Sequence, residues 1–441
     1  MAAVQRARGR VEPAKHPPGA LHRLDRLHSS RHAPGGTQHE AAVDPAGHGD
    51  RLSRGIRPSD AGQQGDDPLN VTILAENLTF GGVSRYCLDL AEGLRAYPDV
   101  QVTLLALPDR RADWLLRAAE TREVPVQVLP MRSTFDPSII GRMRHWLRER
   151  QVDILHSQGY RSNLIARLAV RGGRLTTRLV CTVHGLHYSS AVSPRLRLFF
   201  MLDYLSMFTS DRVIAVSRDT CGQLMRRGLQ QKTRVIHNGT VIPPPVDLEA
   251  RRTSRQALGI APHTKVVTFV GRLTHQKGPG ALVDVARRMV STMDNVVFLL
   301  VGDGPCMEDI RGCVQDLFPR VRLLGRQDDV TPFYTAADVL FMPSLYEGLP
   351  MTLIEAFAHG LPAVASRVGG VPEVIQDGVN GFLCEADQTA QMCERLEKIL
   401  RDDALRHEMG AQARRSAETS FSIAQMCAHT YQLYRQLVSS Q

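Results

Sequence analysis

A repeated alternation of short Val/Ile/Leu runs and helix-length amphipathic stretches, beginning at Val71, constrains the fold most strongly. Such alternation is typical of parallel strands joined by crossover helices. It stops at residues 242–245, whose Ile-Pro-Pro-Pro sequence has the composition of an interdomain linker, and then starts again. A chain of 441 residues is also too long for one ordinary domain. We therefore expect an α/β protein with two doubly wound, Rossmann-like domains facing across a cleft.

The expected strands fall into two sets of six. The first set comprises residues 71–75, 102–105, 153–156, 179–183, 213–216 and 234–237. The second comprises residues 266–270, 296–301, 321–323, 339–342, 363–365 and 381–383. Doubly wound proteins bind ligands outside the carboxyl ends of their strands. Residues that directly follow these strands are therefore the first candidates for a functional site.

The composition bounds the class of protein. Hydrophobic residues make up 43% of the chain, which fits a globular protein. No apolar run reaches the roughly 18 to 20 residues that span a bilayer, and the N-terminus contains no apolar signal core. We therefore expect the protein in the cytoplasm. The eight cysteines show neither a C-x-x-C pair nor zinc-like spacing, so we interpret them as reduced packing residues.

The formal net charge of +9 has three interpretations, and much of the excess lies between Arg142 and Arg234. A basic surface favours anionic lipid or an anionic acceptor, which would place the protein on the inner face of the plasma membrane. Solvated arginines are an equally simple explanation. Nucleic acid is disfavoured, because no recognisable nucleic-acid module is present and aromatic residues are only 5% of the chain. Residues 195–205 mix basic and apolar side chains, and core packing is favoured over membrane contact for them.

Residues 1–68 are rich in Arg, His, Pro, Gly and Ala and have few large apolar side chains. Such a segment buries too little surface to offset the entropy of ordering, so we expect an N-terminal extension that is disordered. Three explanations stay open: a functional basic tail, a targeting peptide, or an upstream stretch translated from a start site assigned too early. A transit peptide should lack acids, yet Asp25, Glu40, Asp44 and Asp50 interrupt this segment.

Two carboxylates, Glu347 and Glu355, stand eight positions apart around a turn formed by Gly348, Leu349 and Pro350. Proline suits the first turn of a helix, so Glu347 is expected in the preceding loop and Glu355 within the helix. Unsatisfied N–H groups at a helix start, together with the macrodipole, can receive a diphosphate. Here those groups belong to Leu349, Met351 and Thr352. The stretch therefore indicates a sugar-nucleotide site.

This E-G-x-P-x-x-x-x-E pattern resembles the E-x7-E motif of the retaining glycosyltransferases of family four, which have the two-domain GT-B fold. Other motifs follow in the order of that family. They are Gly81-Gly82, Thr182-Val183-His184-Gly185, Gly271-Arg272-Leu273 with Lys277-Gly278, Val301-Gly302-Asp303-Gly304-Pro305, and Val368-Gly369-Gly370. Each motif alone is weak, because such glycine pairs occur in many α/β chains. Together they extend the resemblance from about Leu69 to the C-terminus.

Arg272 and Lys277 follow a strand expected to end at Val270, which places both on the rim of the cleft. A guanidinium can hold two phosphate oxygens and an ammonium can act as a point charge. We interpret both as catalytic residues that stabilise the departing diphosphate. Solvated loop charges are the alternative.

Gly81 and Gly82 follow the first expected strand, where glycine lets the backbone approach a ligand closely. The resemblance implies that this loop lies near the donor phosphates and the acceptor; an ordinary strand-to-helix turn is the alternative. His184 ends the fourth expected strand, and the resemblance implies a contact with the donor sugar. A structural role is the alternative for this histidine.

The resemblance further implies that Glu355 binds the ribose hydroxyls and that Glu347 meets the transferred sugar. Gly302 and Asp303 would form the turn beside the nucleotide, and Arg326 would lie near the base. A simple turn and a solvated arginine are equally open alternatives for these residues. Two carboxylates could instead flank a glycosidic bond about 5 to 5.5 Å apart, as in a retaining hydrolase. The Gly-Leu-Pro turn and the Arg/Lys pair favour phosphate departure over that mechanism. The family generally works without a bound cation, so we expect no metal and no cofactor.

The resemblance therefore implies a retaining glycosyltransferase that moves a sugar from a uridine or guanosine diphosphate donor to a glycan or lipid-linked acceptor. In that family the first domain would comprise residues 69–243, completed by a C-terminal helix within 421–441, and the nucleotide-sugar domain would comprise residues 244–420. A GT-B epimerase or phosphorylase, a catalytically silent sugar-nucleotide binder, and a basic adaptor protein are the alternatives. Fold alone does not choose among them.

Overall fold

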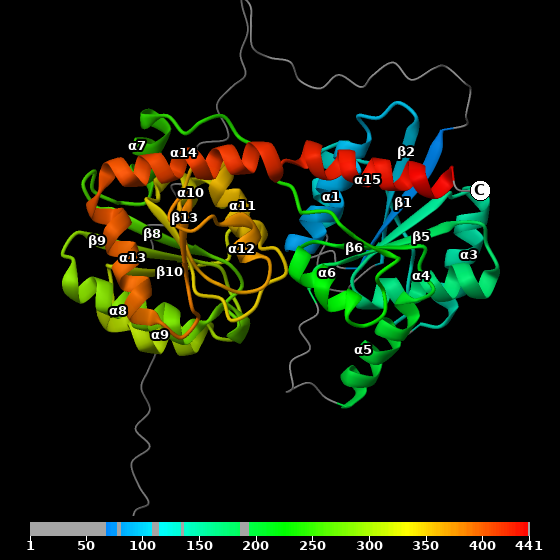
Figure 1. Ribbon diagram of the computed structural model, residues 1–441, viewed down its shortest axis with the longest axis horizontal. Helices are drawn as coiled ribbons and strands as arrows, with labels where there is room; N and C mark the ends of the chain where they lie inside the picture. Colours follow the sequence, from blue (N-terminus) through cyan, green and yellow to red (C-terminus); the bar gives the residue numbers. More distant parts are fainter. Residues whose placement is uncertain (1–67, 77–80, 108–113, 134–135, 186–193, 440–441) are drawn as a thin grey trace, which may run out of the picture. The chain divides into compact units, whose positions relative to one another are not determined.

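The computed structural model describes residues 68–76, 81–107, 114–133, 136–185 and 194–439. These residues form two parallel sheets, in the strand orders β3-β2-β1-β4-β5-β6-β7 and β10-β9-β8-β11-β12-β13 (Figure 1). The first sheet consists of β1 (Leu69–Ala75), β2 (Val100–Ala106), β3 (Val126–Val128), β4 (Ile154–Gln158), β5 (Arg178–Val183), β6 (Arg212–Ala215) and β7 (Thr233–Val235). The second consists of β8 (Lys265–Val270), β9 (Val296–Val301), β10 (Val321–Gly325), β11 (Val339–Met342), β12 (Ala363–Ser366) and β13 (Gly381–Cys384).

Helices connect the strands of both sheets. Those before the proline-rich stretch are α1 (Gly82–Leu94), α2 (Trp114–Thr121), α3 (Ser138–Glu149), α4 (Tyr160–Gly173), α5 (Pro194–Met207) and α6 (Arg218–Met225). Those after it are α7 (Leu248–Ala257), α8 (Pro279–Thr292), α9 (Met307–Val314), α10 (Thr331–Ala336), α11 (Met351–Ala358), α12 (Val371–Val374), α13 (Thr389–Arg401), α14 (Asp403–Ser420) and α15 (Ile423–Val438). Two 3₁₀ turns, η1 (His275–Lys277) and η2 (Gln315–Leu317), complete the set.

The expected α/β fold with two doubly wound sheets is confirmed. Each of the expected strands is present, with ends shifted by at most two residues. Strand β3 was not predicted, because it has only three residues and lies at the edge of its sheet, where Val128 is 43% exposed. The expected extension lies outside the described residues, apart from Pro68. The eight cysteines are all free, and Cys313 is exposed rather than packed.

Alternating side chains of each strand enter different cores, as the pleat requires. In β8, Val266 and Val270 belong to the cluster under α10, α11 and α14, whereas Val267 and Phe269 belong to the cluster under α8, α9 and α13. The first sheet is built in the same way, with α1, α2 and α15 on one face and α3 and α4 on the other (Figure 1). Both sheets therefore have helices on both faces, and their strand ends are left to form a site.

The last helix of the chain packs against the first sheet. Met426, Cys427 and Tyr434 of α15 belong to the same buried cluster as strand β1 and helix α1. A Cβ atom on Gly93 of α1 would lie 2.5 Å from the Cys427 sulfur, so this glycine permits the close approach of the two helices. A parallel bridge between Thr240 and Ser422 ties the start of this return segment to the end of the first sheet.

Helix α5 differs from the packing expected for residues 195–205. Its Met201, Leu202 and Leu205 side chains are 50%, 43% and 53% exposed. On its other side, Asp203 and Met207 are buried. The prediction of core packing is thus correct for one side of the helix and wrong for the other, because three large apolar side chains face solvent.

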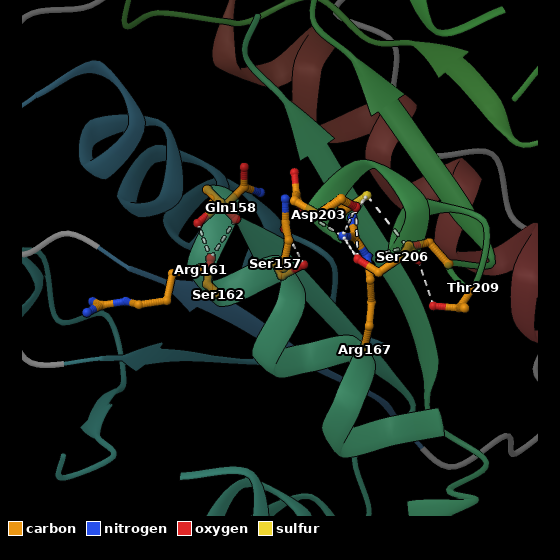
Figure 2. Close-up of polar contacts among 12 residues, drawn as sticks. Ser157, Gln158, Arg161, Ser162, Arg167, Asp203, Ser206 and Thr209 are labelled. Carbon is orange, nitrogen blue, oxygen red and sulfur yellow. Dashed lines mark hydrogen bonds and ion pairs between the residues drawn. The ribbon is translucent and has the colours of Figure 1, made fainter. Parts of the chain in front are cut away.

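Arg167 of α4 and Asp203 of α5 form an ion pair with an N–O distance of 2.7 Å and side chains only 2% and 0% exposed. Figure 2 shows the guanidinium reaching toward Asp203 and Ser206, to whose hydroxyl it donates at 2.7 Å. Removing one partner of a buried pair leaves the other charge without compensation. This pair therefore holds α5 against α4.

We predict that Arg167→Met lowers the free energy of unfolding by about 3 to 5 kcal/mol. Arg171→Met is the matched control on the same helix, because its pair with Asp211 joins an arginine side chain that is 40% exposed. An exposed pair contributes about 0 to 1 kcal/mol. Urea unfolding of the three proteins measures the difference. Equal losses in the two variants would contradict the importance assigned to burial.

Candidate active site

A cavity of about 810 Å³ lies at the carboxyl ends of the strands. It is lined by residues that follow β1, β4 and β5 of the first sheet and β8, β9, β10 and β11 of the second. Every residue to which the sequence analysis gave a catalytic or donor-binding role borders it. The members of this set are Gly81, Gly82, His184, Arg272, Lys277, Gly302, Asp303, Arg326, Glu347, Gly348, Leu349, Met351, Thr352 and Glu355.

The acidic turn has nearly the expected local structure. Glu347 lies in the loop after β11, and Glu355 lies inside α11. Pro350 is the residue immediately before the helix, with φ −74° and ψ 118°, and not its first residue. The shift follows from the extended ψ angle, and the proline still removes only a backbone donor that a helix start leaves unused. Both carboxylates are nearly buried, with Glu347 5% and Glu355 7% exposed.

Lys277 pairs directly with Glu347, with 2.6 Å between Nζ and Oε1. The lysine ends the 3₁₀ turn η1, and the next residue, Gly278, takes a left-handed φ of +65°. A Cβ atom at Gly278 would lie 1.9 Å from the carbonyl oxygen of Pro343. Glycine is therefore needed there both for its backbone angle and for the contact with the chain that leads to Glu347. The Lys-Gly pair of the motif thus positions the ammonium group.

Glu355 has partners from two other helices. The Tyr334 hydroxyl of α10 donates to its Oε2 at 3.0 Å, and Arg85 of α1 approaches its Oε1 at 3.3 Å. Burial raises the pKa of the Glu355 carboxyl, although Arg85 and the tyrosine hydroxyl oppose that effect. Arg85 was not predicted from the sequence. It is the fourth residue of α1 and one of many arginines, so no local pattern marks it.

Arg272 lies two residues after β8, is exposed, and lines the cavity. Unlike Lys277, it makes no ion pair with a carboxylate among the described residues. A guanidinium placed in a concave site without a counter-ion favours an incoming anion. A guanidinium matches the geometry of a phosphate, to which it can donate two hydrogen bonds.

The Glu347–Leu349 loop is held between two glycine-containing segments. A Cβ atom on Gly348 would lie 1.8 Å from the carbonyl oxygen of His184, and one on Gly369 would lie 1.8 Å from that of Glu347. Gly370 donates its N–H to the Gly348 carbonyl at 2.8 Å. The Val-Gly-Gly motif and the glycine of the acidic turn therefore serve one purpose, which is to let three stretches of backbone lie in contact.

His184 follows β5 and borders the cavity. Its Nε2 lies 2.9 Å from the Gln158 side-chain oxygen, and its ring meets the Tyr86 ring edge-on at 4.9 Å. Burial lowers the pKa of His184 to about 4, so the imidazole is neutral at physiological pH. It can accept or donate a hydrogen bond without carrying charge.

The remaining predicted residues are placed as follows. Gly302 has φ +135°, and a Cβ atom there would lie 1.9 Å from the Gly271 carbonyl oxygen. Asp303 accepts the Gly304 N–H at 2.7 Å, which closes a turn after β9. Arg326 follows β10 and lies 3.3 Å from the exposed carboxylate of Asp328. Gly81 precedes α1 in extended backbone with open space around it, whereas Gly82 faces the Met351 side chain.

Among the described residues, no group of three or more His, Cys, Asp or Glu side chains could hold a metal ion. In the same part of the chain, no helix is long and apolar enough to cross a bilayer. The cations bordering the cavity are those of Arg85, Arg272, Lys277 and Arg326. Sequence reasoning missed Arg85, Asn238 and Gln158; Asn238 donates to the Leu349 carbonyl at 3.1 Å.

Two Rossmann-like sheets with a shared cavity at their carboxyl ends define the GT-B class of α/β protein. Residues 80–250 match the family described as Glycosyltransferase Family 4, and residues 250–416 match the family described as Glycosyl transferases group 1. The chain belongs to glycosyltransferase family 4, and it is an enzyme of the glycosyltransferase type.

Individual relatives agree with this assignment. The chain is 30% identical to the D-inositol 3-phosphate glycosyltransferase of Actinosynnema mirum, over 59% of this chain and 67% of that protein. It is 27% identical to the UDP-Gal:alpha-D-GlcNAc-diphosphoundecaprenol alpha-1,3-galactosyltransferase of Escherichia coli, over 66% of this chain and 77% of that protein. The crystal structure of Anabaena HepE in complex with UDP-glucose has the same fold, with a TM-score of 0.72, 22% identity and coverage of 85% and 100%.

Proposed function

We propose that the protein transfers a hexosyl group, with retention of anomeric configuration, from a uridine or guanosine diphosphate sugar to a glycan or lipid-linked acceptor. One observation carries the proposal. A carboxylate on α11, the N-terminus of the same helix, a lysine and an arginine that pairs with no carboxylate in the described part of the chain all border one cavity. These are the groups that a ribose, a diphosphate and a developing negative charge require.

The donor would lie along α11. Glu355 would accept the ribose hydroxyls in place of Arg85, and the backbone N–H groups of Met351 and Thr352 would donate to the diphosphate. Arg272 and Lys277 would stabilise the charge that grows on the leaving diphosphate. Gly302 and Arg326 would border the base, and His184 the sugar. No metal is required in this arrangement, because side chains and the helix start supply the positive potential.

The mechanism proposed is attack by the acceptor hydroxyl on the face from which the diphosphate departs. The C–O bond to the phosphate breaks as the new glycosidic bond forms, and a donor phosphate oxygen takes the acceptor proton. Glu347 is disfavoured as a covalent nucleophile, because Lys277 already holds its carboxylate at 2.6 Å. Its expected role is to orient Lys277 and to contact the transferred sugar.

The test is a binding screen of the full chain against uridine, guanosine and adenosine diphosphates and their sugar conjugates, read by thermal shift. We expect stabilisation by one base, and its loss in Glu355→Gln. A hit is followed by incubation with lipid-diphosphate and glycan acceptors, with the product anomer assigned by NMR. A lack of stabilisation by every nucleotide would exclude the proposed donor class. An inverted product would exclude retention.

We further propose that the protein binds peripherally to an anionic membrane, where it would meet a lipid-linked acceptor. The supporting surface comprises the exposed side chains of Met201, Leu202 and Leu205, together with Phe208, which is 40% exposed. A basic residue adjoins it, because Lys232 Nζ donates to the Phe208 carbonyl. Apolar side chains beside cations suit an anionic bilayer surface.

Sedimentation with vesicles of phosphatidylglycerol tests this location. We expect binding to the vesicles, weaker binding to phosphatidylcholine vesicles, and a loss on replacing Leu202 and Leu205 by serine. Salt-resistant binding to both vesicle types, or none to either, would contradict the proposed surface. Sugar transfer to a soluble acceptor should be unchanged in the same variant.

A further inference from the structure

A buried chain of hydrogen bonds begins at His184 and leads away from the cavity. Gln158, the last residue of β4, places its side-chain oxygen 2.9 Å from His184 Nε2 and its side-chain nitrogen 2.9 Å from His156 Nε2. The Thr182 hydroxyl lies 2.7 Å from the same His156 nitrogen. His156 Nδ1 then lies 2.6 Å from the hydroxyl of Tyr434, on the last helix.

The chemistry of these groups sets the direction of each bond. An amide oxygen only accepts and an amide nitrogen only donates. His184 must therefore carry its proton on Nε2 to donate to Gln158, and His156 Nε2 must be unprotonated to accept from Gln158 and Thr182. The His156 proton is then on Nδ1, where it donates to the Tyr434 oxygen. Every contact in the chain is satisfied by this single arrangement.

Rotating the Gln158 amide by half a turn would reverse the donor and acceptor roles in every one of these hydrogen bonds. The amide nitrogen would then donate to His184 Nε2, which moves the His184 proton to Nδ1, and His156 would have to donate from Nε2. Because an amide cannot present oxygen to both histidines, the two tautomers are coupled through one side chain. Full burial of His156, Gln158 and Tyr434 excludes water as a substitute partner.

We infer that Gln158 is a positioning residue that holds His184 in its Nε2–H tautomer. The lone pair on His184 Nδ1 is then left to accept a hydrogen bond from a hydroxyl of the bound sugar. This assignment rests on the proposed function for the identity of the ligand, but not for the tautomer. Tyr434 secures the far end of the chain, through His156. The last helix of the protein thereby influences a ring nitrogen at the sugar site, which it does not contact.

The burial of both imidazoles is consistent with neutral rings throughout. Burial lowers the pKa of His156 to about 3, with the nearby His184 adding to the effect. A neutral ring has one protonated nitrogen, so the hydrogen-bond partner decides which one carries the proton. Gln158 is that partner for both rings.

The experiment is ¹⁵N NMR of the histidine side chains in the full chain, because protonated and unprotonated ring nitrogens differ strongly in chemical shift. The chain has 16 histidines, so His184 is assigned from the signals lost in His184→Gln. We expect the Nε2–H pattern in the wild type. In Gln158→Met, which keeps the shape and removes both polar contacts, we expect a tautomer mixture. Tyr434→Phe should change the His156 signals more than the His184 signals, because Tyr434 contacts His156 directly.

Kinetics provide the second measurement. Loss of one neutral hydrogen bond to a ligand lowers kcat/KM for the donor about five- to tenfold in Gln158→Met. Gln127→Met is the matched control, because the Gln127 side chain on β3 accepts a hydrogen bond from Trp146 at 2.9 Å and does not border the cavity. It should leave kcat/KM unchanged.

An Nδ1–H or mixed pattern for His184 in the wild-type protein would overturn the inference whatever the variants do. So would a Gln158→Met spectrum in which the His184 signals are unchanged. A wild-type enzyme that transfers no sugar from any nucleotide donor would overturn the proposed function instead, while the tautomer pattern would still be read directly.

Discussion

Arg272→Ala is expected to lower kcat about 10²- to 10³-fold, equivalent to about 2.7 to 4 kcal/mol of transition-state stabilisation. Arg272 is exposed, lines the cavity and has no carboxylate partner among the described residues, so its charge is available to the leaving diphosphate. Lys277→Ala should lower kcat by a similar factor. The measurement is single-turnover transfer from the donor that the binding screen identifies.

The two variants should differ in stability. Lys277→Ala removes the ammonium group that lies 2.6 Å from the Glu347 carboxylate, and this carboxylate, which is 5% exposed, loses a nearby positive charge, so we expect a loss of stability. Arg272→Ala leaves no such group behind, and its thermal midpoint should stay close to that of the wild type. Arg311→Ala, on the exposed surface of α9, is the control for loss of an arginine. Unchanged turnover in both cavity variants would refute the assigned leaving-group role.

Gly348→Ala is expected to lower kcat/KM at least about 100-fold, because a displacement of about 1 Å at a reacting centre can cost that much. Its added Cβ atom would lie 1.8 Å from the His184 carbonyl oxygen. This contact is with backbone, so no side-chain rotation can relieve it. The Glu347–Leu349 loop must therefore move away from β5. The substitution removes no buried apolar side chain, so the loss of activity should exceed the loss of stability.

Gly312→Ala provides the comparison for this variant. Gly312 lies in helix α9, and an added Cβ atom there meets nothing within 4 Å. Alanine is the better helix former, so this control should be neutral or slightly stabilising. If Gly348→Ala retained wild-type kcat/KM, the close approach of the two backbones would have no role in the reaction.

The sequence predicted the parallel strands well because most are short runs rich in Val, Ile and Leu between turn residues. Strand β9 is buried at all six positions and was placed to the residue. Strand β3 escaped prediction because an edge strand with exposed residues lacks that signal. The exposed side of α5 escaped for a different reason. Apolar residues predict burial in general, and the pattern does not reveal whether the fold supplies a partner surface.

The candidate site was predictable where glycine and proline mark the backbone. Gly278, Gly348 and Gly369 each leave room for a carbonyl oxygen of another segment, and such needs make motifs visible in a single sequence. Arg85 and Gln158 have no such mark. Their partners lie 270 and 26 residues away, and only the folded chain brings these side chains together.

The return of α15 to the first sheet has a consequence for how the protein is made. Strand β1 begins at Leu69, but its buried cluster also contains Leu433 and Leu437. Ribosomes add about 5 to 20 residues per second, and domains generally fold as they emerge. Here the apolar surface of the first sheet and α1 that α15 later covers stays exposed while the second sheet is being synthesised. The first sheet, although it leaves the ribosome earlier, is therefore completed last, and a nascent chain stalled before residue 423 should depend on chaperones.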